Sequence, residues 1–178
     1  MNEKVFNDPK APLYIISHTS VMESVFGNVF MTTSGVQTSG GASQIMLLVL
    51  TNPPGSGVRA LVDLVDMGVN SSTLAVFTIR FNGTVSGVLP VPAYNLNTGV
   101  SHSPACTAAA GGGAGVSITG GQIFWTDYPD VAETYYPMAI VLTQGNSLAI
   151  SYTFSSSGNS GAFSMRWYEI PLDVNSWL

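Results

Sequence analysis

Apolar and polar residues alternate along much of this chain, and the alternation restricts the fold more than any other feature. The clearest runs have apolar residues at every second position: Phe77, Ile79 and Phe81; Leu148, Ile150, Tyr152 and Phe154; Phe163, Met165 and Trp167. Successive side chains of a strand point to opposite faces of its sheet, so this pattern is typical of half-buried strands. The spacing in Val58–Val69 also fits a helix, but its β-branched residues and its position after a turn favour a strand.

Turn-forming residues separate the apolar runs at short intervals. Asn52–Gly57, Gln144–Asn146 and Ser155–Gly161 interrupt the pattern, and Asn82-Gly83 predicts a tight hairpin turn because both residues tolerate a positive φ. We therefore expect an all-β fold of eight to ten short strands, arranged as a two-sheet antiparallel sandwich of jelly-roll type. The expected strands span residues 12–17, 21–32, 44–51, 58–68, 73–81, 84–91, 115–125, 137–143, 147–155 and 162–170.

Charged residues are scarce, and this composition excludes several classes of protein. Five basic and ten acidic residues make up 8% of the 178 residues, whereas an ordinary soluble domain has about 25%. The chain is neither a disordered tail, which is rich in charge, nor a coiled coil, which is rich in Glu and Lys. A net charge of −5 without a basic cluster argues against nucleic acid as a partner. One cysteine excludes a disulfide framework.

The chain shows no sign of membrane insertion or of secretory targeting. Its longest apolar run, Ile45–Leu50, is far shorter than the ~20 residues that a membrane helix needs. No secretory signal peptide is visible at the N-terminus, because no apolar run there precedes a small-residue cleavage site. The length is typical of one domain.

Residues 1–20 differ from the rest, and we divide the chain into an extended N-terminal arm (1–20) and a β-sandwich domain (21–178). The arm contains two prolines and a cluster of charges before an apolar run. It is either a frayed terminus or a strand that completes the sheet of a neighbouring copy. In the second case its apolar residues make the contact: Val5, Phe6, Leu13, Tyr14, Ile15 and Ile16.

No group of residues predicts catalysis or a bound cofactor. His102 and Cys106 lie four apart, but a zinc site needs three or four ligands, and a Cys–His nucleophile needs an orienting group. Asp127, Asp130 and Glu133 could hold Ca²⁺, but their spacing matches no EF-hand, and an acidic solvated loop explains them as well. Asp63 and Asp66 are three apart on an expected strand, so we place them on opposite faces. Arg59, Arg80 and Arg166 are the expected partners of these acids, within or between subunits.

The aromatic residues Trp125, Tyr128, Tyr135 and Tyr136 surround the acidic loop. Aromatic side chains on a loop can stack on a sugar ring or anchor a protein interface, and they can also cap the core of a sandwich. We therefore name these four as candidate contacts to a ligand or a partner. The 44 residues from Gly83 to Thr126 contain no charged side chain, so we expect another copy to cover this region.

Three segments of the chain resemble a group of short all-β structural proteins found in phage virions and in surface or spore appendages of Gram-positive bacteria. The segments are Thr51–Val58, Phe77–Thr84 and Ala162–Glu169. The resemblance implies a structural, self-assembling role. Spore-appendage subunits often carry cross-linking cysteines in the N-terminal arm, and this arm has none.

We thus expect a non-enzymatic structural subunit of a homopolymeric extracellular fibre or appendage, assembled by β-strand complementation from the arm. The main alternatives are a structural protein of a phage virion and a trimeric tail-fibre or receptor-binding module that binds a glycan. The expected partners are copies of the same chain, or a surface glycan or host receptor. The expected location is a surface appendage or a virion. A monomer would need charged side chains to stay soluble and to keep its sheet edges from aggregating, whereas a subunit covered by neighbours does not need them.

Overall fold

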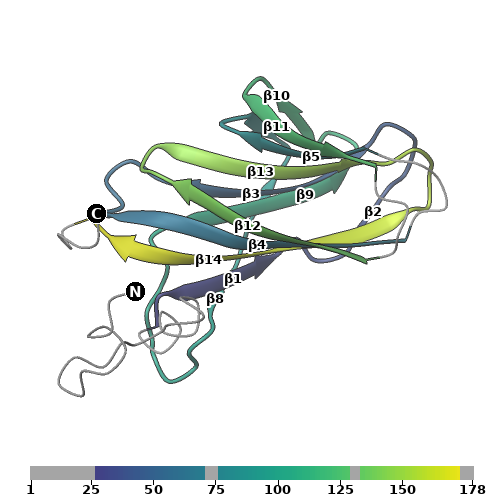
Figure 1. Cartoon of the computed structure of the whole chain (residues 1–178). Helices are drawn as coiled ribbons and strands as arrows, with labels where there is room; N and C mark the ends of the chain where they lie inside the picture. Colours follow the sequence, from purple (N-terminus) through teal and green to yellow (C-terminus); the bar gives the residue numbers. More distant parts are fainter. Residues whose placement is uncertain (1–26, 71–75, 129–132, 173–178) are drawn as a thin grey trace, which may run out of the picture.

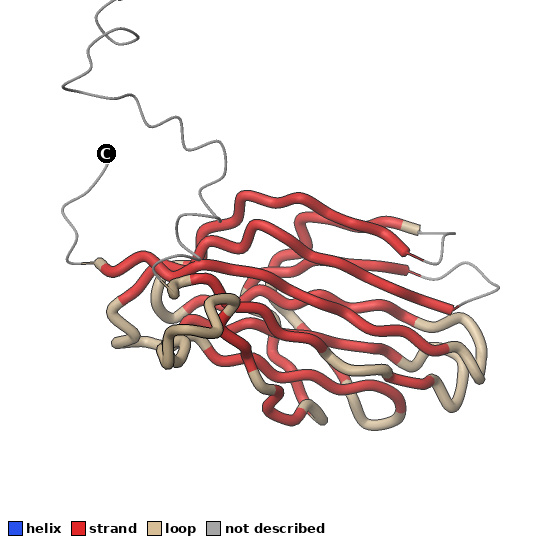
Figure 2. Tube along the Cα trace, turned by 90° about the horizontal axis from the view of Figure 1, so that it is seen from below, coloured by secondary structure: helices blue, strands red, loops and turns tan. Residues whose placement is uncertain are grey.

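A computed structural model describes residues 27–70, 76–128 and 133–172, and the predicted arm lies outside these residues. The described residues form strands, turns and loops without a helix, as Figure 2 shows. The strands are β1 (Val29–Thr33), β2 (Gln37–Thr38), β3 (Ile45–Asn52), β4 (Val58–Asn70), β5 (Val76–Phe81), β6 (Thr84–Ser86), β7 (Leu89–Val91), β8 (Ala93–Asn95), β9 (Thr107–Gly113), β10 (Ser117–Thr119), β11 (Gln122–Asp127), β12 (Glu133–Leu142), β13 (Asn146–Thr153) and β14 (Ser160–Pro171).

The strands form two large sheets and one small one (Figure 1). The first sheet has the order β12-β4-β14-β1-β8, with β2 also paired to β14, and the second has the order β11-β5-β13-β3-β9-β7. Strands β6 and β10 pair only with each other among the described residues. Every pairing is antiparallel. The all-β antiparallel prediction is therefore confirmed.

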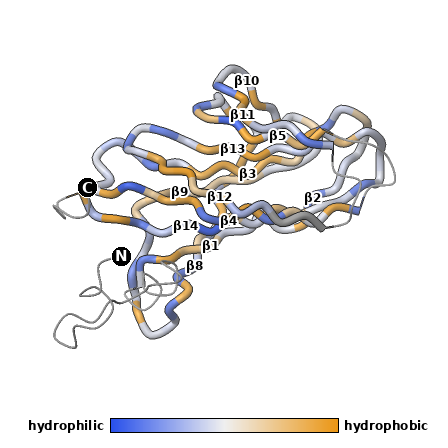
Figure 3. The backbone as a smooth tube through the Cα atoms, in the orientation of Figure 1, coloured by the Kyte–Doolittle hydropathy of each residue, from blue (hydrophilic) through white to orange (hydrophobic). Residues whose placement is uncertain are grey.

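One apolar core lies between the two large sheets, because each sheet turns the apolar half of its alternating residues toward the other. The first sheet contributes Phe30, Val62, Met165 and Trp167, and the second contributes Met46, Leu48, Ile79 and Ile150, all of them buried. Hydrophobic residues lie along β3 and β13, in the middle of the second sheet (Figure 3). The segment Val58–Val69 belongs to β4, so the strand interpretation of this segment is confirmed.

Several details of the strand prediction are wrong between β5 and β11. The expected strand 84–91 is split into β6 and β7 at Gly87, which has a positive φ, and β8 and β9 were not expected. Asn82 has the expected positive φ of 52°, yet Asn82-Gly83 makes no hairpin. Its side-chain oxygen instead accepts a hydrogen bond from the backbone of Ser147 at 2.8 Å, while β5 pairs with β11 and β13. The expected strand 115–125 is split into β10 and β11 at Gly120 and Gly121, both of which have positive φ. The described residues therefore contain fourteen strands, more than the expected eight to ten.

The small sheet β6–β10 covers the outer face of the second sheet, and β10 is at the top of Figure 1. Leu47, Val49 and Ala149 point away from the main core and are nevertheless buried. They pack against residues of the covering segment and of β9: Val85, Val88, Ala109, Val116 and Ile118. Part of the uncharged region Gly83–Thr126 is therefore covered by its own chain and needs no second copy for that purpose.

Glu169 connects the two sheets through a buried carboxylate on β14. It is 2% exposed and accepts hydrogen bonds from the backbone N–H groups of Ala105 and Cys106, at 2.8 and 2.9 Å. The indole Nε1 of Trp167 donates a third, at 3.2 Å. Hydrogen bonds that a carboxylate accepts are stronger than those between neutral groups. Glu169 thereby fixes the start of β9, in the second sheet, to β14, in the first.

We expect Glu169→Ala to lower the free energy of unfolding by about 3–5 kcal/mol, since each buried donor left without an acceptor costs about 1–3 kcal/mol. Urea unfolding measures this loss. Glu169→Gln keeps the volume and one acceptor oxygen, so its loss should be smaller, and exposed Gln122→Ala serves as the neutral control. A loss for Glu169→Ala no larger than that of the control would contradict the anchoring role.

Candidate functional site

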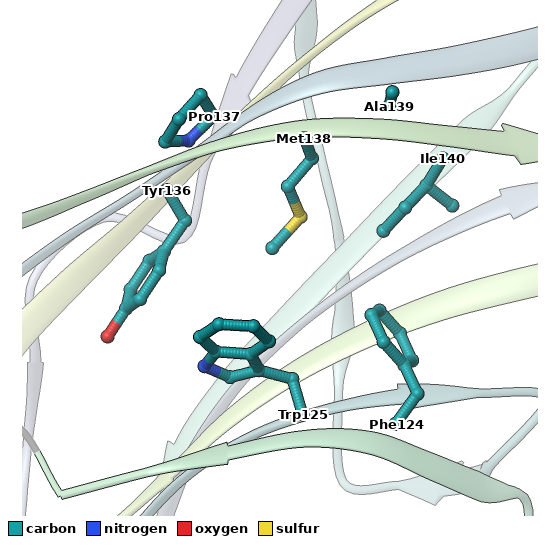
Figure 4. Close-up of a pocket in the computed structure, with 7 residues that line it drawn as sticks. All are labelled: Phe124, Trp125, Tyr136, Pro137, Met138, Ala139 and Ile140. Carbon is teal, nitrogen blue, oxygen red and sulfur yellow. The ribbon is translucent and has the colours of Figure 1, made fainter.

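An apolar cleft opens where the edge strands β11 and β12 lie next to each other. β11 ends the second sheet and β12 ends the first, so the cleft joins the margins of both sheets. We call it the edge cleft; its volume is about 400 Å³, and its lining residues are Phe124, Trp125, Tyr136, Pro137, Met138, Ala139 and Ile140. In Figure 4, Tyr136, Met138 and Ile140 of β12 point toward Trp125 and Phe124 of β11, whereas Pro137 and Ala139 lie on the other side of β12. Such a volume is within the range of small-molecule and side-chain binding clefts.

Each of the two edge strands contains a β-bulge, and the bulge in β11 aims side chains into the edge cleft. In β11, Ile123 and Trp125 pair with the adjacent residues Arg80 and Ile79, so Phe124 is an extra residue. The bulge lets two consecutive aromatic residues face the same side: the Phe124 ring stacks on Phe81 at 4.5 Å, and the Trp125 ring meets the edge of Tyr136 at 6.3 Å. Bulges commonly redirect side chains at sheet edges.

The second bulge lies in β12. Pro137 pairs with Leu64 and Ile140 pairs with Val62, so Met138 and Ala139 together face the single residue Asp63. Because Pro137 has no N–H and the bulge interrupts the ladder, β12 offers an irregular row of backbone groups to an incoming strand. Contacts at this edge therefore depend on side chains more than on the extension of the sheet.

Tyr136 and Asp127 hold the inner end of the cleft. Tyr136 is buried, and its ring stacks on Phe77 with centroids 4.9 Å apart. Its hydroxyl donates to one carboxylate oxygen of Asp127 at 2.9 Å, while the other oxygen accepts from the backbone N–H of Tyr128 at 2.8 Å. Both carboxylate oxygens of Asp127 thus accept hydrogen bonds from within the chain. The described residues contain no group of three or more His, Cys, Asp or Glu side chains that could hold a metal ion.

The four predicted aromatic contacts are divided by the structure. Trp125 and Tyr136 meet in the cleft, but they lie on strands and not on a loop. Tyr128 is exposed and does not line the cleft, and Tyr135 belongs to β12, with its side chain outside the described residues. The sequence reasoning missed Phe124, because the bulge that aims it has no signal in the alternation. It also missed the stretch Pro137–Ile140, which contains no aromatic residue.

The edge cleft is apolar and uncharged. Next to it or in it, Ile123, Trp125 and Val141 are 49%, 48% and 55% exposed. The segments Ile123–Thr126 and Thr134–Leu142 contain no charged residue. A sugar needs several hydrogen-bonding groups, whereas this lining is mostly carbon, and its Tyr136 hydroxyl is already donated to Asp127. Its chemistry suits apolar side chains of another protein surface.

The predicted placement of Asp63 and Asp66 on opposite faces is wrong. A bulge also separates Arg166 and Trp167 in the β14–β4 pairing and leaves Asp63 as the extra residue, which reverses the alternation there. Asp63 therefore lies on the outer face, where it forms a two-pronged ion pair with Arg166 at 2.8 and 3.0 Å. Asp66 pairs with Ser164, which lies between the core residues Phe163 and Met165 and so faces outward as well. The expected role of Arg166 as an acid's partner is confirmed.

Cys106 and His102 lie in different surroundings. Cys106 is 2% exposed within the core, whereas His102 is exposed, and its ring is 5.8 Å from the Phe30 ring. Burial raises the pKa of the Cys106 thiol well above its ordinary value, and the charge of Glu169 and a hydrogen bond to it raise it further. The thiolate, which is the nucleophile and the metal ligand, is therefore disfavoured.

We expect the Cys106 thiol to resist an aromatic disulfide reagent in the folded protein even at pH about 9, above the usual thiol pKa of about 8.5. In urea the same reagent should label one thiol per chain. The release of the coloured thiolate measures both rates. Equal labelling rates for folded and unfolded protein would contradict the burial of this thiol.

Among the described residues, no helix has the length and apolar character needed to cross a membrane. Comparison with known proteins gives no family: no protein-family model, no curated protein and no solved structure matches the chain.

Proposed function

We propose that this protein is a structural subunit whose copies assemble through the edge cleft, in an extracellular fibre or appendage or in a virion. The observation that supports this proposal is the apolar margin formed by the segments Ile123–Thr126 of β11 and Thr134–Leu142 of β12, where Trp125 and Val141 are exposed. Soluble monomers commonly protect sheet edges with charged side chains. Here the segments Ile123–Thr126 and Thr134–Leu142 provide none.

Electrostatics supports a contact between copies at this place. Each chain carries a formal net charge of −5, so two copies repel each other at most approaches. A neutral apolar margin is the kind of surface through which they can meet without placing like charges together. The association then draws on the burial of apolar area, at about 25 cal/mol per Å².

The strand order supports a jelly-roll arrangement for the subunit. The eight strands β1, β3, β4, β5, β11, β12, β13 and β14 are arranged as β12-β4-β14-β1 in the first sheet and β11-β5-β13-β3 in the second. Most successive members of this set change sheet, as in a double-sheet jelly roll of eight strands. Such domains occur in viral capsids and in lectins, so the arrangement is compatible with the proposal without selecting it.

The variant Ala139→Arg tests the proposal, because it places a charge and a long side chain at an exposed position on the rim of the cleft. We expect the wild type to form oligomers or polymers in sedimentation velocity and the variant to sediment as a monomer. Val36→Arg, at an exposed apolar position elsewhere, is the matched control and should assemble like the wild type. A wild type that remains monomeric at high concentration would contradict the proposal.

Deletion of residues 1–20 tests strand complementation separately. Because β11 and β12 are bulged and Pro137 lacks an N–H, we expect the truncated chain to associate still and to remain sensitive to Ala139→Arg. Sedimentation velocity of the truncated chain with and without the substitution measures this. If association requires the arm and ignores Ala139→Arg, the arm and not the cleft joins the copies.

A further inference from the structure

We infer that Met138 is an oxidation-sensitive residue of the edge cleft, and that conversion of its thioether to a sulfoxide by a peroxide weakens the contact between copies. This inference rests on the proposed function and adds a chemical control to it. The position of the sulfur supports it. Met138 lines the cleft, and its sulfur and terminal methyl group point toward Trp125 of the facing strand (Figure 4).

Met138 differs from most of the described methionines in its access to solvent. Met46, Met67 and Met165 lie in the main core and are 0% exposed. Met138 is half-buried: it packs against the core and also lines the open cleft. Met31 is half-buried too, but it belongs to β1 and does not line the cleft. Among the methionines that the structure describes, Met138 is therefore the one that an oxidant can reach in the cleft.

The reaction needs a peroxide and no catalytic group. The thioether sulfur attacks one peroxide oxygen, the O–O bond breaks, and a sulfoxide forms together with water or an alcohol. The sulfur is oxidised and the peroxide is reduced by the same electron pair. The Cys106 thiol is a poor competitor, because it is 2% exposed and burial raises its pKa well above the ordinary value. Oxidation of sulfur depends on thiolate character and exposure, so the accessible thioethers react first.

The sulfoxide changes the chemistry of the cleft. A thioether is apolar, whereas a sulfoxide is polar and its oxygen accepts hydrogen bonds. Water satisfies this oxygen while the cleft is open, but a second copy that covers the lining removes the water. The Tyr136 hydroxyl is no substitute, because it already donates to Asp127 at 2.9 Å. A polar group buried without a partner is costly, so the oxidised cleft is a poorer contact surface.

Association and oxidation therefore oppose each other. A copy that covers the cleft shields the sulfur of Met138, so a peroxide acts mainly on free subunits, and an oxidised subunit associates less readily. Methionine sulfoxide reductases reverse this oxidation. The control is thus reversible, and association should return when the sulfoxide is reduced.

Peroxide treatment of the full chain tests the inference. Hydrogen peroxide is added to dilute protein, in which free copies dominate, and is removed before the protein is concentrated. Peptide mass spectrometry measures the oxidation of each methionine, and sedimentation velocity measures association. We expect Met138 to be oxidised faster than the core residues Met46, Met67 and Met165. The apparent dissociation constant of the oxidised protein should rise by about tenfold or more, because of the buried sulfoxide oxygen.

Three variants serve as controls. Leu and Met have similar volumes, so we expect Met138→Leu to associate like the wild type and to keep its association after peroxide treatment. Met31→Leu should lose association after peroxide treatment, as the wild type does. Met138→Gln places a polar amide in the cleft without any oxidant, and we expect it to associate as weakly as the oxidised wild type. Near-ultraviolet circular dichroism confirms that each protein is folded.

The outcomes separate this inference from the proposed function. If the untreated wild type is monomeric, the proposed function fails, and the control of association fails with it. If the wild type associates but Met138 resists peroxide as well as the core methionines do, the inference is wrong, although self-assembly stands. The inference is also wrong if oxidised wild type and oxidised Met138→Leu lose association equally, because another residue is then responsible.

Discussion

The packing of two six-stranded sheets across one apolar core is the constraint on which the rest of the structure depends. Each strand must turn every second side chain into this core, which determines the outward residues and the strands left at the margins. The outer face of the second sheet is covered by β6 and β10. At both margins the chain crosses between the sheets in consecutive strands, from β7 to β8 at one and from β11 to β12 at the other, and the edge cleft lies between β11 and β12. The topology therefore determines which strands line the cleft.

This arrangement shows where the uncharged part of the chain lies in the fold. The uncharged region Gly83–Thr126 has three parts: β6 and β10 form the layer over the second sheet, β7 and β8 lie at one margin, and most of β11 lies at the other. Of these parts, the layer has its apolar side chains packed within the chain, with Val85, Val116 and Ile118 on Leu47 and Val49. The exposed residues Leu89, Tyr94, Ile123 and Trp125 remain, and we propose that neighbouring copies cover Ile123 and Trp125, at the edge cleft.

Local alternation predicted the long strands well, because the apolar residues at every second position of β5, β13 and β14 are the ones that face the core. The prediction of which face a side chain takes failed where a bulge shifts the alternation by one residue. The extra residues Phe124 and Asp63 moved Trp125 into the cleft and Asp63 to the face of Arg166, and no turn residue announces either shift. The layer β6–β10 was missed because its burial depends on contacts with β3, which are distant in sequence. Of the candidate contacts, Trp125 and Tyr136 were found from their aromatic character, while Met138 and Ala139 have no such signal.

Hydrogen exchange measured at low and at high protein concentration tests most directly whether copies meet through the edge cleft. The account predicts that exchange slows with concentration in β11 and β12 and stays unchanged in β6 and β10. Protection confined to the outer face of the first sheet, around Met31 and Arg166, would contradict it, as would exchange that does not depend on concentration.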